Sequence, residues 1–103
     1  MFSRFVKKST GAFPMDELIK YVIKSTYRVR VLNAIGGDVK MPFQIAEESN
    51  ILNNHISKTL RQLREHGLVE LINPEMPRGR LYRLTNTGKI VLIKIKSDTL
   101  WKK

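Results

Sequence analysis

The stretch from residue 45 to residue 88, IAEESNILNNHISKTLRQLREHGLVELINPEMPRGRLYRLTNTG, contains the signals that decide the fold. Apolar residues recur at helical spacing on both sides of Asn50, and asparagine tolerates the left-handed backbone of a tight turn. Pro42 suits the first position of the earlier helix, because its missing amide proton would be unpaired there anyway. The pattern therefore predicts a short helix over 43–49 and a second helix after Asn50.

The second helix is predicted to begin at an Asn53 cap, to run to His66 and to end at Gly67. At about 100° per residue, three aliphatic residues share one face, which we assign to the core: Ile56, Leu60 and Leu63. The other face and the first turn carry polar residues: Asn53, Asn54, His55, Ser57, Lys58, Arg61 and Glu65. Each of these except Glu65 has a side chain that can donate a hydrogen bond. This helix therefore has one buried face and one face free to bind a partner.

A β-hairpin is predicted to follow, with strands over 68–72 and 80–85. The connection NPEMPRG at 73–79 is rich in turn formers and too polar to be buried. Arg78 and Arg80 flank its glycine, whereas Tyr82 and Leu84 are expected to join Ile45 in the core. Two helices followed by such a long-looped hairpin, the wing, predict a winged helix-turn-helix that is mainly α with one small antiparallel hairpin.

Helices are also predicted on both sides of this unit. One starts near Asp16 with the stripe Leu18, Ile19, Val22 and Ile23, and the next is capped by Ser25 or Thr26 and ends at Gly36 and Gly37. A short strand is expected over 39–41. The last segment is β-branched, yet the Thr85 cap and its spaced lysines favour a helix with Ile90 to Ile95. A winged core does not need both outer apolar surfaces, so we assign 18–23 and 90–100, with Trp101, to a dimer interface.

Length and charge narrow the class of protein. A chain of 103 residues fits one domain, which we place at 14–103 after a basic arm at 1–13 that is either a solvated terminus or a contact to a polyanion. The net charge of +10 favours DNA, RNA or an anionic membrane as partner. The absence of cysteine excludes disulfides and thiolate metal ligands and leaves the redox compartment open. No apolar run is long enough to span a bilayer or to form a signal peptide, so the expected location is cytoplasmic.

The segments YRVRVLNAI, IAEESNILNNHISKTLRQLREHGLV and RGRLYRLTNTG, in this order, resemble the winged helix-turn-helix transcriptional regulators of the ArsR and MarR type, and most closely the small archaeal forms. The similarity covers roughly residues 25–96. It implies a homodimer in which the third helix of each winged-helix domain lies in the major groove of double-stranded DNA. The wing then lies on the minor groove or the backbone. Asn50 stands where glycine is frequent in the family, and the metal-sensing cysteines of many ArsR members are absent, so metal sensing does not carry over.

On this resemblance, the DNA-binding residues are Asn53, Asn54, His55, Ser57, Lys58, Arg61, Arg78 and Arg80. Arginine can bond guanine and asparagine can bond adenine in the major groove, so we assign base reading to Arg61 and Asn54. Ser57 is expected to contact phosphate, and Thr59 to pack inside. Arg78 at the wing tip can enter a narrow minor groove. Arg80 either does the same or forms a salt bridge within the domain.

An enzymatic function finds no support in the residue inventory. His55 and His66 lie eleven positions apart near opposite ends of one helix, which does not fit a helical metal site, and no phosphate loop or nucleophile elbow occurs. We expect no catalytic residue, no cofactor and no metal. The open alternatives are a winged-helix module that binds a protein or RNA, for which Glu65, Phe2, Phe5 and Met76 leave room, and a nonspecific nucleoid-associated DNA-binding protein.

Overall fold

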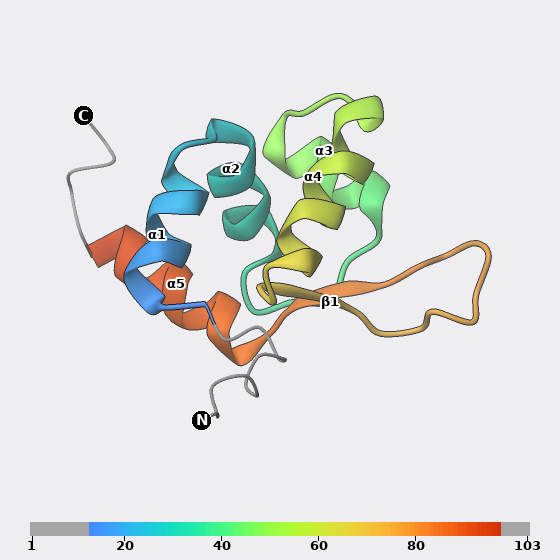
Figure 1. Cartoon of the computed structure of the whole chain (residues 1–103). Helices are drawn as coiled ribbons and strands as arrows, with labels where there is room; N and C mark the ends of the chain where they lie inside the picture. The colour runs from blue at the N-terminus through green and yellow to red at the C-terminus, as the bar shows by residue number, and fades with distance from the viewer. Residues whose placement is uncertain (1–12, 98–103) are drawn as a thin grey trace.

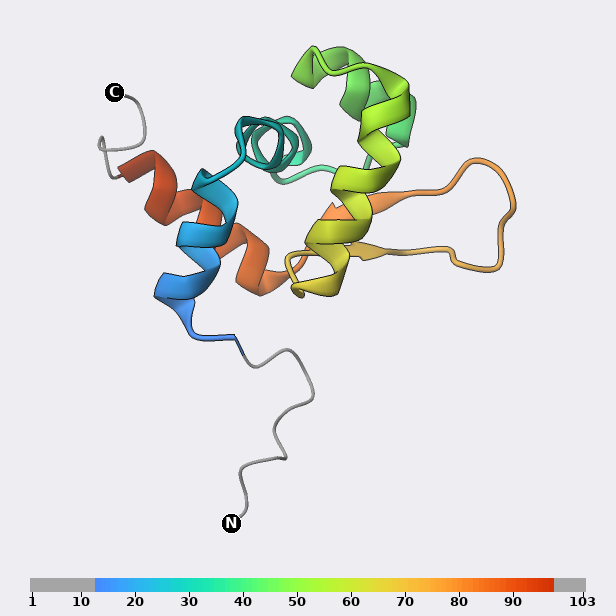
Figure 2. The same ribbon diagram turned by 45° about the horizontal axis from the view of Figure 1, so that its top comes forward.

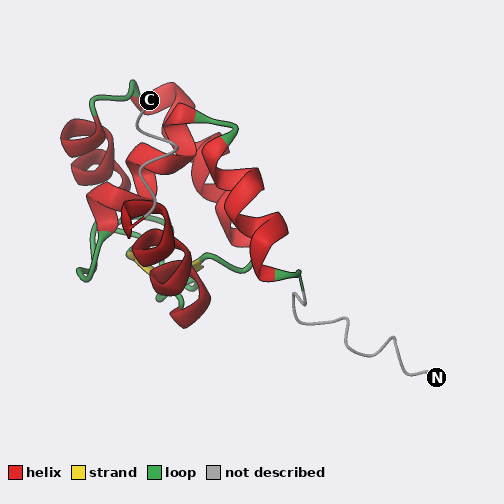
Figure 3. Cartoon of the chain, turned by 90° about the vertical axis from the view of Figure 1, so that its left-hand side faces the viewer, coloured by secondary structure: helices red, strands yellow, loops and turns green. Residues whose placement is uncertain are grey.

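The computed structural model describes residues 13–97, which form five helices and one two-stranded antiparallel sheet (Figure 1). The elements follow in the order α1 (Met15–Ile23), α2 (Thr26–Ile35), α3 (Pro42–Ser49), α4 (Asn53–Glu65), β1 (Val69–Leu71), β2 (Tyr82–Leu84) and α5 (Asn86–Ser97). The predicted fold class is confirmed, and Figure 3 shows how little of the described chain is strand. The basic arm up to residue 12 and the end of the predicted dimer segment, including Trp101, lie outside the described residues.

Helices α1 and α2 begin and end where the local chemistry predicts. Asp16 and Glu17 occupy the first turn of α1, where the helix dipole favours negative charge. Ser25 caps α2, since its hydroxyl oxygen accepts a hydrogen bond from the Arg28 amide at 3.3 Å. Gly36 ends the helix with a positive φ of 54°, a conformation that costs glycine little. Ser25 is therefore the cap, and Thr26 is the first helical residue.

The helix-turn-helix consists of α3 and α4. Pro42 is the first residue of α3, and Asn50 ends it in the left-handed region at φ 59° and ψ 45°, as predicted. The predicted cap of α4 is wrong: Asn53 is the first helical residue, and Leu52 occupies the cap position without a side-chain hydrogen bond. The helix also ends at Glu65, one residue before the predicted end, because the chain already turns at His66 towards Gly67.

The two strands are shorter than predicted, with Val69 opposite Leu84 and Leu71 opposite Tyr82. Main-chain pairing continues for one bond beyond the strands, from the Ile72 amide to the Leu81 carbonyl at 2.8 Å, before the chain opens into the wing. The predicted strand over 39–41 is wrong as a strand. Only Lys40 pairs, through two main-chain bonds to Tyr82, because Pro42 already starts α3.

Helix α5 packs against α1 and α2 on the side of the core remote from the wing (Figure 2). Thr85 caps it, accepting a hydrogen bond from the Gly88 amide at 3.0 Å, so the helical prediction for this segment is confirmed. All six predicted core residues of the central stretch are buried: Ile45, Ile56, Leu60, Leu63, Tyr82 and Leu84. The core thus holds α4 by one face only and leaves its other face in solvent.

Candidate nucleic-acid interface

The free face of α4 carries every residue that the sequence assigned to it. The six predicted contact residues of this helix are exposed: Asn53, Asn54, His55, Ser57, Lys58 and Arg61. On the opposite face Thr59 is buried, and its hydroxyl donates to the His55 carbonyl at 2.9 Å, which confirms that Thr59 packs inside. Within residues 13–97, Lys58 and Arg61 take part in no salt bridge, so their charges are available to a partner.

The wing extends well beyond the sheet on the side where α4 lies (Figures 1 and 2). Asn73 holds its base together, since its side-chain oxygen accepts from the Leu81 amide at 2.8 Å and its side-chain nitrogen donates to the Gly79 carbonyl at 3.1 Å. Gly79 has a φ of 66°, which lets the chain reverse between the two arginines. The wing is therefore a closed loop with a defined base.

Both wing arginines are exposed, but they differ in what they contact. The Nε of Arg80 donates to the Met76 carbonyl at 3.0 Å, so Arg80 braces the loop from within. The alternative of an internal salt bridge for Arg80 finds no acidic partner in the part of the chain that the structure describes. Arg78 has no such bond there, and it is the wing residue better placed to reach outward.

An aromatic cluster at the far end of α4 was not foreseen from the sequence. The Tyr21 ring lies between the His66 ring, at 3.6 Å between centroids, and the Arg28 guanidinium, at 3.7 Å from the ring centroid. Arg28 also donates to the Tyr21 carbonyl at 2.6 Å and to the Gln62 side chain at 3.3 Å. This cluster ties α1 and α2 to the end of α4. It joins residues that no local periodicity relates.

Burial raises the pKa of the Tyr21 hydroxyl above its usual 10.0, with Arg28 acting in the opposite direction. His55 lies beside Tyr27 of α2, with 5.5 Å between ring centroids, at the other end of α4 from His66. No cluster of three potential metal ligands occurs among the described residues.

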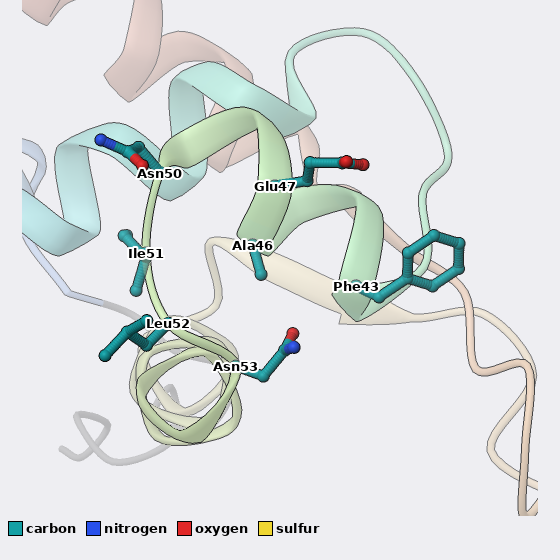
Figure 4. A pocket seen from close by; sticks show the side chains of 7 residues that line it. All are labelled: Phe43, Ala46, Glu47, Asn50, Ile51, Leu52 and Asn53. Atoms are coloured by element: carbon teal, nitrogen blue, oxygen red, sulfur yellow. The ribbon is translucent and has the colours of Figure 1, made fainter.

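A shallow groove lies between α3 and the first turn of α4 (Figure 4). Its lining comes from both helices and the turn that joins them: Phe43, Ala46, Glu47, Asn50, Ile51, Leu52 and Asn53. Leu52 is 70% exposed and Phe43 is 55% exposed, so the groove has two free apolar walls beside the polar first turn of α4. Neither residue was predicted from the sequence to belong to the site.

No helix in the described part of the chain is long and apolar enough to cross a membrane.

No protein-family model and no curated protein sequence matches this chain. Several solved structures do match in fold. A MarR family transcriptional regulator from Silicibacter pomeroyi superposes with a TM-score of 0.65 at 24% identity, over 80% of this chain and 56% of that one. A mutant of Lactococcus lactis ZitR gives 0.62 at 20% identity, over 71% and 51%.

A third structure, NadR in complex with 4-hydroxyphenylacetate, gives a TM-score of 0.61 at 17% identity, over 81% of this chain and 63% of that one. The chain thus spans between half and two thirds of the length of these three structures. At such identities the likeness concerns the fold, and it agrees with the order of helices and wing described above. The chain therefore has the winged-helix fold found in MarR family transcriptional regulators.

Proposed function

We propose that this protein is a sequence-specific regulator of transcription that binds double-stranded DNA in the cytoplasm, on the nucleoid, as a homodimer. The observation that carries the proposal is the free face of α4, on which six polar or basic side chains are exposed while the opposite face is fixed in the core. A helix of this kind fits the major groove, where base edges offer distinct patterns of donors and acceptors. The net charge of +10 supports a polyanionic partner.

The residues divide by the contacts that their chemistry allows. Arg61 and Asn54 can form paired hydrogen bonds to guanine and adenine, and each good pair contributes about 1–3 kcal/mol of discrimination. Asn53, His55, Ser57 and Lys58 are assigned to phosphates or neighbouring base edges. Arg78 is assigned to the minor groove or backbone beside it. Arg80 joins the contact surface through its exposed guanidinium while its Nε holds the wing.

The dimer is assigned to the outer helices α1 and α5. Ile93 and Ile90 of α5 are 64% and 43% exposed, and Ile23 of α1 is 41% exposed, so apolar side chains remain uncovered on both helices. A two-fold dimer predicts a pseudo-palindromic site with half-sites about one helical turn, roughly 34 Å, apart. Light scattering at tens of micromolar tests this point, and a strictly monomeric protein would contradict the dimer. In this proposal residues 14–103 form the DNA-binding domain. The arm at 1–13 is either a solvated terminus or a further contact to the DNA.

The DNA proposal is tested by selecting bound duplexes from a random pool and measuring their affinity at two salt concentrations. Arg61→Ala should flatten the sequence preference. Arg78→Ala should weaken all duplexes about equally and lower the salt slope by about one. Arg30→Ala, which removes the same charge from the exposed surface of α2, is the matched control and should change neither property.

The outcomes separate this function from its alternatives. A selected sequence that outcompetes bulk DNA supports sequence-specific regulation. Equal binding to every duplex would leave a nonspecific nucleoid-associated protein. Absence of any duplex binding would leave a protein- or RNA-binding module on the same fold.

A further inference from the structure

The aromatic cluster joins the first helix of the chain to the helix that carries the proposed DNA face. Tyr21 belongs to α1 and Arg28 to α2, whereas Gln62 and His66 form the last turn and the cap of α4. The Phe13 ring, just before α1, also stacks on His66, at 4.8 Å between centroids. Elsewhere α1 packs mainly against α2 and α5. The cluster therefore gives α1 a direct contact with the end of α4.

Arg28 gives this contact a definite geometry. Its Nε donates to the Gln62 side-chain oxygen at 3.3 Å, an Nη donates to the Tyr21 carbonyl at 2.6 Å, and its guanidinium carbon lies 3.7 Å from the Tyr21 ring centroid. No salt bridge within residues 13–97 involves Arg28. A planar guanidinium with its donors in a rigid fork makes such contacts in one orientation, which a flexible lysine does not reproduce. Arg28 is therefore suited to hold α1 and α4 at a fixed angle.

The angle between α1 and α4 matters because the two helices have different tasks in the proposed dimer. Helix α1 is assigned to the interface between protomers, and the first turn of α4 is assigned to base edges. Asn54 lies eight residues before Gln62, which is about 12 Å along the helix axis. A rotation of α4 by about 15° relative to α1, with the cluster as pivot, would move Asn54 by about 3 Å, close to the rise of about 3.4 Å per base pair. A change of this size would alter the spacing at which the two protomers meet their half-sites.

We propose that Arg28 is a positioning residue that sets the half-site spacing of the dimer by holding α4 at a fixed angle to α1. The inference rests on the proposed DNA-binding dimer and gives the aromatic cluster a role in specificity. In this role Arg28 acts through Gln62 and Tyr21 and contacts no base itself. Both half-sites must be bound at once, so loss of the fixed angle reduces discrimination between spacings and leaves the contacts to each half-site intact.

The test uses the full chain and duplexes that carry two copies of the selected half-site. Their spacing is varied by one and two base pairs in either direction, and a further duplex carries a single half-site. Wild-type protein should prefer one spacing over its neighbours by about tenfold in fluorescence anisotropy. Arg28→Lys keeps the charge but loses the fork, so it should reduce this preference to about threefold or less. Its affinity for the single half-site should remain that of wild type.

Two further substitutions separate the cluster from its surroundings. Arg30→Lys makes the same change on the exposed surface of α2, outside the cluster, and should keep the wild-type spacing preference. Tyr21→Leu removes the ring between Arg28 and His66 and should weaken the preference, whereas Tyr21→Phe keeps the ring and should retain it. Circular dichroism checks that each variant is folded at the temperature of the assay.

The inference is overturned if Arg28→Lys or Tyr21→Leu keeps the wild-type spacing preference, even with a lower melting temperature, because the cluster would then only stabilise the fold. Equal loss of affinity for every duplex, the single half-site included, also overturns it, as does a wild-type protein that binds all spacings alike. These results leave sequence-specific binding intact. Failure to select any duplex, or a strictly monomeric protein, overturns the proposed function itself.

Discussion

Gly88 is the position where a single methyl group should damage the fold most clearly. It lies in the first turn of α5 and is buried against the chain at the start of β1. A Cβ at Gly88 would lie 2.0 Å from the Leu68 carbonyl oxygen and 3.0 Å from the carbonyl carbon. Ordinary non-bonded contact needs about 3.5 Å, so Gly88→Ala must push α5 and Leu68 apart by roughly 1 Å or more.

The expected cost follows from three terms. Overpacking of this kind costs about 1–3 kcal/mol. The same Leu68 carbonyl accepts the Thr85 amide at 3.0 Å, and weakening this bond adds about 1 kcal/mol. In the opposite direction, alanine stabilises the helix by about 1 kcal/mol relative to glycine, because its helix propensity is higher. The free energy of unfolding should therefore fall by about 1–3 kcal/mol, and each kcal/mol lowers the melting temperature by roughly 4–8 °C.

Urea and thermal unfolding followed by far-UV circular dichroism measure this change. Gly37→Ala is the matched control, since a Cβ there meets nothing within 4 Å, and it should leave the stability unchanged or raise it by about 0.4–1 kcal/mol. If Gly88→Ala proves as stable as wild type, the predicted clash is absent. The close approach of α5 to the Leu68 carbonyl is then wrong.

Three further predictions concern the turn, the aromatic cluster and the wing. Asn50→Ala should lower the free energy of unfolding by about 1 kcal/mol in urea titrations, because a φ of 59° is less favourable for alanine than for asparagine. Equal stability of the two proteins would refute this account of the turn. Since burial raises the pKa of Tyr21, the folded state holds this proton more tightly than the unfolded state; the resulting stability is present below pH 10 and is lost as pH rises through the folded pKa. Unfolding above pH 10 should therefore depend less steeply on pH in Tyr21→Phe than in wild type, and identical slopes would contradict it. Asn73→Ala should change the melting temperature little but weaken binding to the selected duplex in fluorescence anisotropy, because the exposed base of the wing loses its two side-chain bonds; unchanged affinity would show that the wing needs no such order.

Much of the fold was predictable because its signals are local. Pro42, Asn50, Gly67 and Thr85 start or end elements through their own backbone and hydrogen-bonding properties, and each acts where expected. The buried and exposed faces of α4 followed from the helical period alone. The error at its start has a local cause as well, since a run of two asparagines attracted the cap assignment that the structure gives to Leu52.

Contacts that depend on the conformation of a loop or on the packing of whole elements were not predictable. The sequence named Arg80 as a candidate for DNA or a salt bridge, and only the closed loop brought the Met76 carbonyl to its Nε. The apolar groove beside α4 was likewise hidden, because exposure of Leu52 and Phe43 depends on how α3 and α4 cross.

The sequence by itself determined that these helices form, which faces they bury and that a basic, polar face of α4 remains free, because these properties depend on neighbours within one or two turns. The tertiary structure alone decided that Tyr21 lies between Arg28 and His66, and that Gly88 meets the Leu68 carbonyl too closely for any side chain. Such contacts depend on how whole elements pack, and side-chain volume and backbone distance set them rather than the order of residues along the chain.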